Sequence, residues 1–372
     1  MDQKQRTIDC NGSTMHQNLR AIYCNISTMD QKLRITGRNI ATMQRSQPIT
    51  IQILMAMWDM QMVYYPLLAV VGVPVNVVTI VILSQGKCGL SKCVTRYLVT
   101  MAAADLQVVI LDVILRQLPI IYQFQFLESI PVCNIHAVLL YAATDCSVWF
   151  TVTFTFDRFV AISCRKLKTK YCTEKTAVVV LGTVTVLSGL KNITWYFMLT
   201  GRYWLNSTPW FCDATFSVQF SMTWAAIEFL HNIITPFLPF VLILLLNALT
   251  VRHILLASKG RRRLRGPCSG ESPRDPEMES RRKSIILLFV ISANFILLWA
   301  MFMIYSIWRR MEYLRYYSVY MPTFVLEMGM MLQLLGCCTN TCIYAVLQTK
   351  FREQLKNTVT YPFTLIVQFI KR

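Results

Sequence analysis

Seven long apolar stretches, separated by short polar segments, set the pattern of the chain. An α-helix needs about 20 apolar residues to cross roughly 30 Å of hydrocarbon, and each stretch reaches that length. The predicted spans are residues 62–84, 96–117, 132–162, 174–198, 222–251, 283–308 and 319–348. The pattern therefore predicts an all-α membrane protein built as a bundle of seven transmembrane helices.

Polar segments flank this bundle at both ends. Residues 1–61 hold a degenerate repeat, as in MDQKQRTIDCNGST and MHQNLRAIYCNIST, and their polar composition predicts a disordered extracellular tail. A tandem duplication without function is the alternative explanation. The seven-transmembrane bundle is predicted to comprise residues 62–348. Residues 349–372 are expected to form a short cytoplasmic tail, in which KFREQLKN predicts an amphipathic eighth helix with Phe351 and Leu355 facing lipid.

Composition and charge agree with a membrane protein and set its orientation. The chain is 55% hydrophobic and carries a net charge of +18, with a mean hydropathy of +0.44. Lys and Arg gather in the first, third and fifth loops and in the C-terminal tail, which places those segments inside and the N-terminus outside. The basic residues of the N-terminal tail oppose this orientation. The inner charge favours membrane lipid with anionic head groups, and no soluble basic domain indicates nucleic-acid binding.

Two cysteines and three sequons are expected on the outer side. Cys133 begins the third span, and Cys212 lies in the outer loop between spans four and five. Both would face an oxidising compartment, so a disulfide between them is predicted. The glycosylation candidates are Asn11, Asn25 and Asn206, each two residues before Ser or Thr.

An acidic and a basic residue stand together at the end of the third span. Asp157 and Arg158 follow Cys133 by a helix length of about 37 Å, which places Arg158 at the inner membrane boundary. Alone, such an Arg is also compatible with a side chain that only anchors the helix end in the head groups.

Other residues in the chain give this pair a context. One characteristic residue occurs in most of the spans, in a fixed order: Asn76, Asp105, Cys133, Arg158, Pro239, Trp299, Asn340 and Tyr344. With this set, residues 62–358 resemble the rhodopsin-like, class A, G-protein-coupled receptors, and in particular an orphan subgroup linked to aromatic amino acid ligands. The resemblance implies a receptor in the plasma membrane with a heterotrimeric G protein as its partner.

The resemblance also implies roles for particular residues. Asp157, Arg158 and Tyr344 would form the switch for G-protein coupling, and Trp299 and Pro239 would act in activation. The sixth span begins with Arg281, Arg282 and Lys283, which are expected to repel Arg158 instead of holding it. Elevated basal activity is therefore predicted.

An acidic residue in the middle of the second span points to a bound cation or a proton. Asp105 lies in the middle of the second span, where a charge costs roughly 2.5 to 3.5 kcal/mol without partners. By resemblance it would share an allosteric sodium ion with Ser147 and Asn340; the alternative is a protonated Asp105 bonded to Asn76. No other metal or cofactor is expected. Asp112 and Arg116, four residues apart, predict a structural pair on one helix face.

The predicted ligand pocket lies in the outer half of the bundle. Leu140 stands five helical turns before Arg158, on the inner face of the third span, and its lack of charge argues against a biogenic amine and puts an amino acid ligand in question. The candidates are Leu140, Tyr141, Asp145, Glu228, His231, Phe302 and Glu327, with Trp224 as a further wall. Three carboxylates favour a cationic small molecule or a peptide as ligand. The alternative for each polar candidate is a hydrogen bond between helices.

Two other classes of protein are the alternatives to a receptor. A multi-span transporter or channel is the alternative function, but the chain shows neither an inverted repeat nor paired broken helices. An enzyme is not expected, because no H-E-x-x-H, G-x-S-x-G or P-loop pattern occurs. The loop between spans five and six predicts either a solvated linker or a G-protein contact and kinase substrate, with Ser280 and Ser284 flanking its basic cluster.

Overall fold

The computed structural model describes residues 47–122, 130–197, 222–264, 276–313 and 321–370. The chain divides into two units, Met1–Ala56 and Met57–Arg372. Of the first unit the structure describes only residues 47–56, at the start of the first helix. Four candidates fall outside the described residues: Cys212 and the glycosylation candidates Asn11, Asn25 and Asn206.

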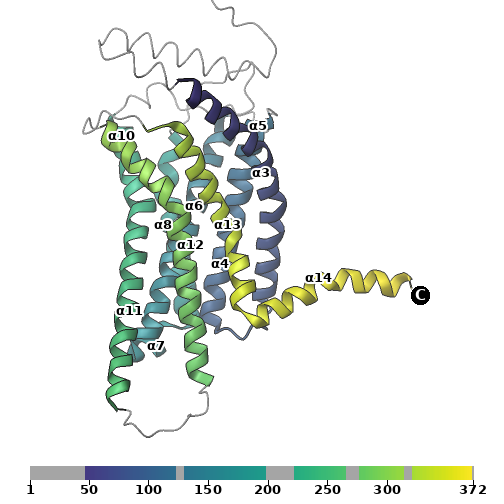
Figure 1. Cartoon of the computed structure of the whole chain (residues 1–372), viewed down its shortest axis with the longest axis vertical. Coiled ribbons are helices and arrows are strands. Elements are labelled where there is room, and N and C mark those ends of the chain that lie inside the picture. Colours follow the sequence, from purple (N-terminus) through teal and green to yellow (C-terminus); the bar gives the residue numbers. More distant parts are fainter. Residues whose placement is uncertain (1–46, 123–129, 198–221, 265–275, 314–320, 371–372) are drawn as a thin grey trace, which may run out of the picture. The chain divides into compact units, whose positions relative to one another are not determined.

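Seven helices in the described part of the chain are long and apolar enough to cross a membrane, which confirms the predicted bundle. In chain order the elements are α3 (Gln47–Ser84), α4 (Lys92–Val108), η1 (Val109–Gln117), α5 (Leu118–Tyr122), α6 (Ile130–Ser163), α7 (Arg165–Tyr171), α8 (Glu174–Asn192), η2 (Ile193–Phe197), α10 (Met222–Asn232), η3 (Ile233–Phe237), α11 (Leu238–Leu264), α12 (Pro276–Tyr313), α13 (Thr323–Leu347) and α14 (Thr349–Ile370). No strand occurs among the residues described. Figure 1 shows the spans running side by side.

The first helix begins earlier than the sequence predicted. α3 starts at Gln47 instead of Met62, so the expectation of disorder is wrong for residues 47–61. This segment reads QPITIQILMAMWDMQ, and its many unbranched residues favour a helix. The apolar run that defines the span therefore continues a helix already formed on its outer side.

Polar caps fix where two of the spanning helices begin. The backbone N–H of Val94 donates to Ser91 Oγ at 3.3 Å at the start of α4. The N–H of Thr176 donates to Thr173 Oγ1 at 3.2 Å at the start of α8. Such side chains satisfy amides that have no partner in the first helical turn. Gly86, with a φ of 67°, makes the turn between α3 and α4.

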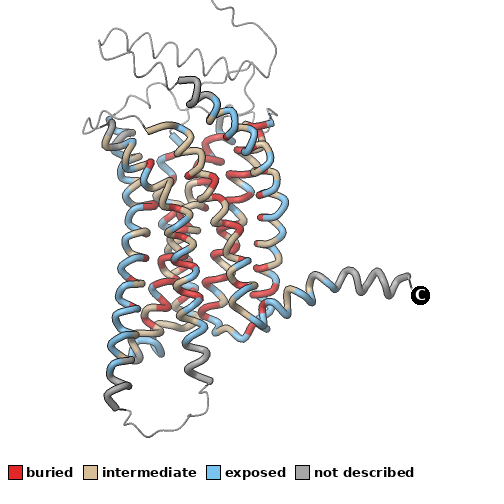
Figure 2. Tube along the Cα trace, in the orientation of Figure 1, coloured by how far each residue is buried: buried red, intermediate tan, exposed pale blue. Residues whose placement is uncertain are grey.

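Burial follows the pattern of a helix bundle in lipid. Large apolar side chains point outward, as for Val179 and Leu187 on α8 and Leu245 on α11. Several polar side chains are instead buried between the helices, among them Asn76 and Asp105. Figure 2 shows the buried positions on the inner faces of the helices. The polar residues that carry chemistry are therefore held inside the bundle.

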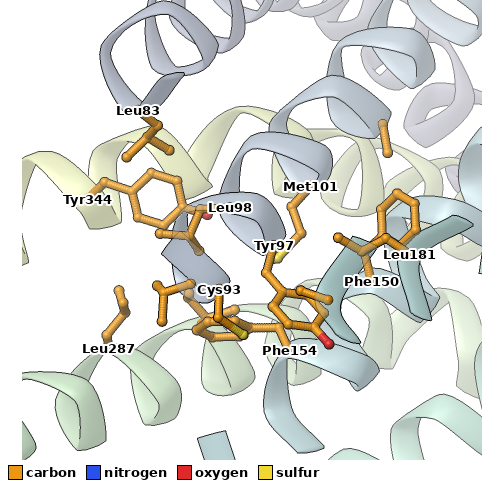
Figure 3. Packing of buried hydrophobic residues seen from close by; sticks show 14 of the residues in the cluster. Leu83, Cys93, Tyr97, Leu98, Met101, Phe150, Phe154, Leu181, Leu287 and Tyr344 are labelled. Atoms are coloured by element: carbon orange, nitrogen blue, oxygen red, sulfur yellow. The ribbon is translucent and has the colours of Figure 1, made fainter. Parts of the chain in front are cut away.

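An apolar cluster packs the inner half of the bundle. It joins Tyr97 of α4, Phe154 of α6, Leu287 of α12 and Tyr344 of α13 (Figure 3). Phe351 of α14 belongs to the same cluster and is fully buried, with its ring 6.0 Å from that of Tyr344. The expectation that Phe351 faces lipid is therefore wrong, because this ring anchors the start of α14 to the bundle.

The fifth span is broken near its middle. Within η3, Thr235 has φ and ψ of −146° and 112°, outside the helical region. Pro236 follows, and a residue before proline is driven toward extended geometry while the proline lacks an N–H for the helix. Pro239, predicted to act in activation, lies after this break and within α11.

Candidate functional site

A cavity of about 220 Å³ opens between the second, third, fifth, sixth and seventh spans, with η2 of the fourth. Its lining residues are Asp112, Arg116, Leu140, Tyr141, Thr144, Trp195, Glu228, His231, Asn232, Thr235, Trp299, Phe302, Met330, Gln333 and Leu334. The predicted pocket residues among them are Leu140, Tyr141, Glu228, His231 and Phe302. Their contact with a ligand stays a prediction.

Two predicted pocket carboxylates are turned to other partners and do not line this cavity. Asp145 is 1% exposed and bonds two residues of α8, the ammonium of Lys191 at 2.6 Å and the amide of Asn192 at 2.5 Å. Glu327 accepts a hydrogen bond from Gln61 Nε2 at 2.9 Å. Of the three predicted carboxylates only Glu228 lines the cavity, where Asp112 and Arg116 join it. Trp224, the further predicted wall, is also absent from the lining.

The pair formed by Asp112 and Arg116 is present, but it belongs to the cavity wall. Arg116 Nη1 donates to Asp112 Oδ1 at 3.2 Å, and Gln117 Nε2 donates to the same oxygen at 3.1 Å. The Arg116 side chain is 35% exposed. The spacing of four residues predicted the pair correctly, but it did not predict that both side chains line the cavity. Both residues belong to the π-helix η1, whose different winding changes the direction in which their side chains point.

An aromatic wall closes one side of the cavity. Tyr141 and Trp195 stack with ring centroids 4.5 Å apart. The His231 ring meets both edge-on, at 5.3 Å from Tyr141 and 5.2 Å from Trp195. Trp195 was not predicted as a pocket residue. It could have been noticed in the sequence as the single Trp of the fourth apolar stretch, near the outer end of that stretch.

Trp299 lies in an apolar cluster between α6, α11 and α12 and also lines the cavity. Its ring stacks on Phe295 at 5.5 Å and meets Phe302 edge-on at 6.1 Å. A ligand in the cavity would therefore touch the same side chain that packs against the middle of α6 and α11.

Asp105 is held by two side chains deeper in the bundle. Ser147 Oγ donates to one carboxylate oxygen at 2.6 Å, and Asn340 Nδ2 donates to the other at 2.8 Å. The structure thus brings together the three residues predicted for a sodium site. Asn76 donates instead to the carbonyls of Gly72 and Cys337, at 2.9 and 2.8 Å, so its predicted bond to Asp105 is wrong.

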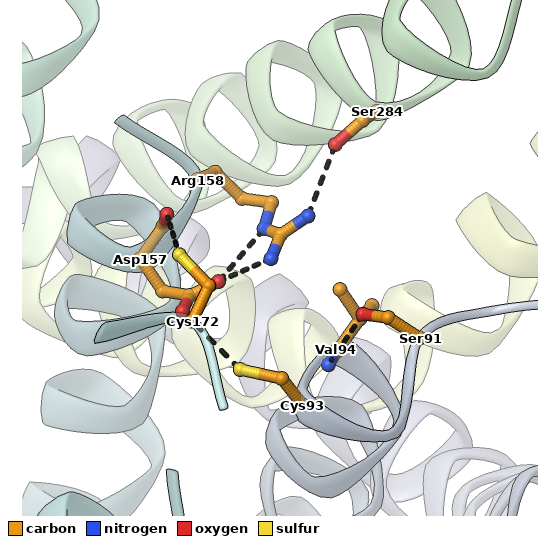
Figure 4. Close-up of polar contacts among 7 residues, drawn as sticks. All are labelled: Ser91, Cys93, Val94, Asp157, Arg158, Cys172 and Ser284. Atoms are coloured by element: carbon orange, nitrogen blue, oxygen red, sulfur yellow. Dashed lines mark hydrogen bonds and ion pairs between the residues drawn. The ribbon is translucent and has the colours of Figure 1, made fainter. Parts of the chain in front are cut away.

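At the inner end of α6, Asp157 and Arg158 form an ion pair (Figure 4). Arg158 Nε donates to Asp157 Oδ2 at 3.0 Å, and Nη2 contacts the same oxygen. Cys93 donates to the other carboxylate oxygen at 3.2 Å. Asp157 is fully buried, so the pair is shielded from solvent.

Arg158 meets the sixth span through a hydroxyl. Its Nη1 donates to Ser284 Oγ of α12 at 3.3 Å. Of the three cations expected to repel Arg158, Arg282 and Lys283 are exposed, and the side chain of Arg281 lies outside what the structure describes. The contact that the structure describes is thus attractive, though its acceptor is uncharged.

A second thiol supports the same pair from the loop before α8. Cys172 Sγ contacts the backbone oxygen of Asp157 at 3.7 Å. Desolvation by burial, reinforced by the charge of Asp157, raises the pKa of Cys172 to about 12. This thiol therefore stays protonated and able to donate at neutral pH.

Only one of the two cysteines of the predicted disulfide, Cys133, lies in the described part of the chain. Cys133 is disulfide-bonded, and every other cysteine in the described part of the chain is a free thiol. Its partner therefore lies outside the described residues, where Cys212 also lies. The pairing of Cys133 with Cys212 stays a prediction.

Comparison with known proteins agrees with this architecture. The family described as 7 transmembrane receptor (rhodopsin family) matches residues 75–344. Probable G-protein coupled receptor 142 of Mus musculus is 24% identical over 308 residues, which are 80% of this chain and 72% of that relative. The finer likeness of LAVVGVPVNVVTIVILSQ to probable G-protein coupled receptor 139 stays a prediction.

Proposed function

The chain belongs to the rhodopsin family of seven-transmembrane receptors, and we propose that it acts at the plasma membrane as a receptor for a small aromatic ligand bearing both charges. As a member of this family it is a multi-pass membrane protein that couples an extracellular ligand to G proteins. The family is one of receptors and not of enzymes, and a transporter or channel is not favoured.

The observation that carries the ligand proposal is Arg116 in the cavity wall, paired on one side with Asp112. A guanidinium has five N–H donors in a planar fork, and the described bond to Asp112 uses a single nitrogen. The remaining donors suit a ligand carboxylate, which Arg binds in a bidentate way. Asp112 and Glu228 supply negative charge for a ligand cation in the same cavity.

Cavity size favours a small ligand. Drug-sized sites usually measure about 300–1,000 Å³, and this cavity measures about 220 Å³. A large peptide would have to place only one terminal residue inside it. The stacked rings of Tyr141 and Trp195 suit an aromatic group, since offset rings attract each other beyond the burial of their area.

The site around Asp105 fits the sodium ion expected from the resemblance. Asp105 supplies two carboxylate oxygens and Ser147 a hydroxyl oxygen, the ligand type that hard cations prefer. Asn340, whose amide nitrogen donates to Asp105 Oδ2, carries a further carbonyl oxygen on its side chain. We propose that these three residues hold the ion. Its charge would compensate the carboxylate of Asp105, which is 2% exposed.

A G-protein reporter assay in transfected cells tests the ligand proposal. L-phenylalanine carries both charges, phenethylamine lacks the carboxylate, and 3-phenylpropionate lacks the amine. L-phenylalanine should signal at a concentration at least tenfold lower than either analogue, and Arg116→Gln should remove this preference over phenethylamine.

The matched control is Arg96→Gln, which alters an arginine that pairs with Glu174 on the inner side. It should leave the preference intact. A preference for phenethylamine in the unaltered receptor would overturn the proposed ligand class. Whole-cell current that persists with the G protein blocked would instead support a channel.

A further inference from the structure

A buried chain of polar contacts joins the third, fourth and fifth spans behind the cavity. Asp145 of α6 binds Lys191 of α8 at 2.6 Å. The ammonium of Lys191 also donates to Thr235 Oγ1 at 3.2 Å. Thr235 lines the cavity, whereas Lys191 and Asp145 do not. The ion pair is therefore connected to the cavity wall through one hydroxyl.

The hydroxyl of Thr235 lies at the point where the fifth span is broken. Thr235 is the residue of the fifth span with non-helical backbone angles. Pro236 cannot donate to the carbonyl four residues before it, so the helix loses a bond at this point. Its outer segment carries His231 and Asn232 into the cavity. A tether at Thr235 thus acts where the span is weakest.

Lys191 is itself held in a defined place. It lies in the last turn of α8, where a cation interacts favourably with the helix dipole. Asp145 accepts from Lys191 and also from Asn192 Nδ2. Asn192 in turn donates to the carbonyl of Ser188 at 2.8 Å and accepts from Trp195 Nε1 at 2.8 Å. The ammonium is therefore fixed by a network that also positions the stacked Trp195.

We propose that Lys191 is a positioning residue of the cavity: Asp145 fixes its ammonium, which holds Thr235 at the break of the fifth span and so sets the wall formed by His231 and Asn232. An ion pair that only neutralised Asp145 would need no bond to Thr235. The inference rests on the proposed role of the cavity as the ligand site, but it is tested without a ligand.

Three variants separate positioning from simple neutralisation. Thr235→Val keeps the shape and leaves the ion pair intact while removing the acceptor. The double variant Asp145→Asn with Lys191→Met removes the tether without leaving a lone buried charge. Lys191→Arg keeps the charge and its donors. Lys175→Met, at an exposed lysine near the inner end of α8, is the matched control.

Hydrogen exchange on the purified full-length receptor measures the tether directly. Thr235→Val and the double variant should each speed exchange of peptides covering residues 228–240 by threefold or more, and all three substitutions together should have no larger effect. Peptides from α6 and α13 should be unchanged. Lys191→Arg and Lys175→Met should exchange like the unaltered receptor.

A second measurement reports on the cavity wall. The probe is 2-aminoethyl methanethiosulfonate, and its rate of reaction with Asn232→Cys is followed by mass spectrometry. Adding Thr235→Val should change this rate at least threefold, whereas adding Lys175→Met should not. Unchanged exchange at residues 228–240, faster exchange in all helices alike, or an unchanged modification rate would each overturn the proposal. Any of these failures would leave the ligand assignment standing, since that depends on Arg116.

Discussion

Arg158 donates to the hydroxyl of Ser284 at 3.3 Å, so the arginine at the inner end of α6 meets α12 through a neutral acceptor. At 3.3 Å this hydrogen bond is longer than the usual range of about 2.7–3.2 Å, and a neutral hydroxyl attracts the charged guanidinium less strongly than a carboxylate would. The contact that holds the two helices together here is therefore weak. A receptor that leaves its resting state easily is the expected consequence.

Strengthening this contact should quiet the receptor. Ser284→Glu places a carboxylate near Arg158 and should lower ligand-free signalling roughly fivefold, since about 1 kcal/mol shifts an equilibrium by that factor. Ser284→Ala should raise it by less than about threefold. A G-protein reporter at matched surface expression measures both. Arg282→Gln lowers the net charge by the same one unit at an exposed neighbouring position and is the control; equal silencing by both variants would rule out a specific contact.

Releasing Arg158 from Asp157 should have the opposite effect. Asp157→Asn removes the charge from a fully buried ion pair, and ligand-free signalling should rise roughly tenfold, in line with a contact of about 1.5–3 kcal/mol. The same reporter measures it. A basal signal equal to that of the unaltered receptor would show that Asp157 does not restrain Arg158.

Changes at Arg158 itself test whether it contacts the G protein or only anchors the helix. Arg158→Ala combined with Asp157→Asn, which leaves no buried carboxylate without its cation, should abolish coupling while surface expression stays within about twofold. Arg158→Lys keeps the charge but loses the planar fork, and it should also lose most signalling. Full signalling by Arg158→Lys at matched expression would support the anchoring role and count against the switch.

Sodium should matter through Asp105. If an ion sits between Asp105, Ser147 and Asn340, sodium chloride should weaken agonist potency by several-fold relative to choline chloride, because sodium should favour the resting state. Asp105→Asn keeps the volume, removes the charge and should abolish the difference. The agonist from the ligand panel supplies the dose–response curves. An equal sodium effect in both proteins would exclude this site.

The disulfide of Cys133 should tie down the outer end of α6. Cys133→Ala and Cys212→Ala should each cut surface expression or ligand response by tenfold or more, and the double variant should be little worse than either. A bridge lost from one end is wholly lost, so the effects should not add. Immunostaining of unpermeabilised cells gives the expression; additive losses would point to a different partner for Cys133.

Much of the inner half of the receptor was predictable, because its chemistry joins residues that are close in sequence or paired by a recurrent motif. Asp157 and Arg158 are neighbours, and their ion pair needs only the side-chain geometry of one helix turn. The contact with Ser284 was not predictable. The basic residues beside Ser284 suggested repulsion, and only the rotation of α12 shows that Arg282 and Lys283 are exposed while Ser284 meets Arg158.

The cavity shows more clearly which features the sequence predicts and which only the tertiary structure decides. Sequence alone determined the seven spans and predicted their orientation and the carboxylates in their outer halves, because apolar length and charge are local properties of the chain. Tertiary structure decided which carboxylates face the cavity: Asp145 is bonded to Lys191 and Glu327 to Gln61, while Asp112 and Glu228 line the cavity. Successive residues of a helix point about 100° apart, so a π-helical turn or a partner from a distant span reassigns a side chain in a way that no local pattern encodes.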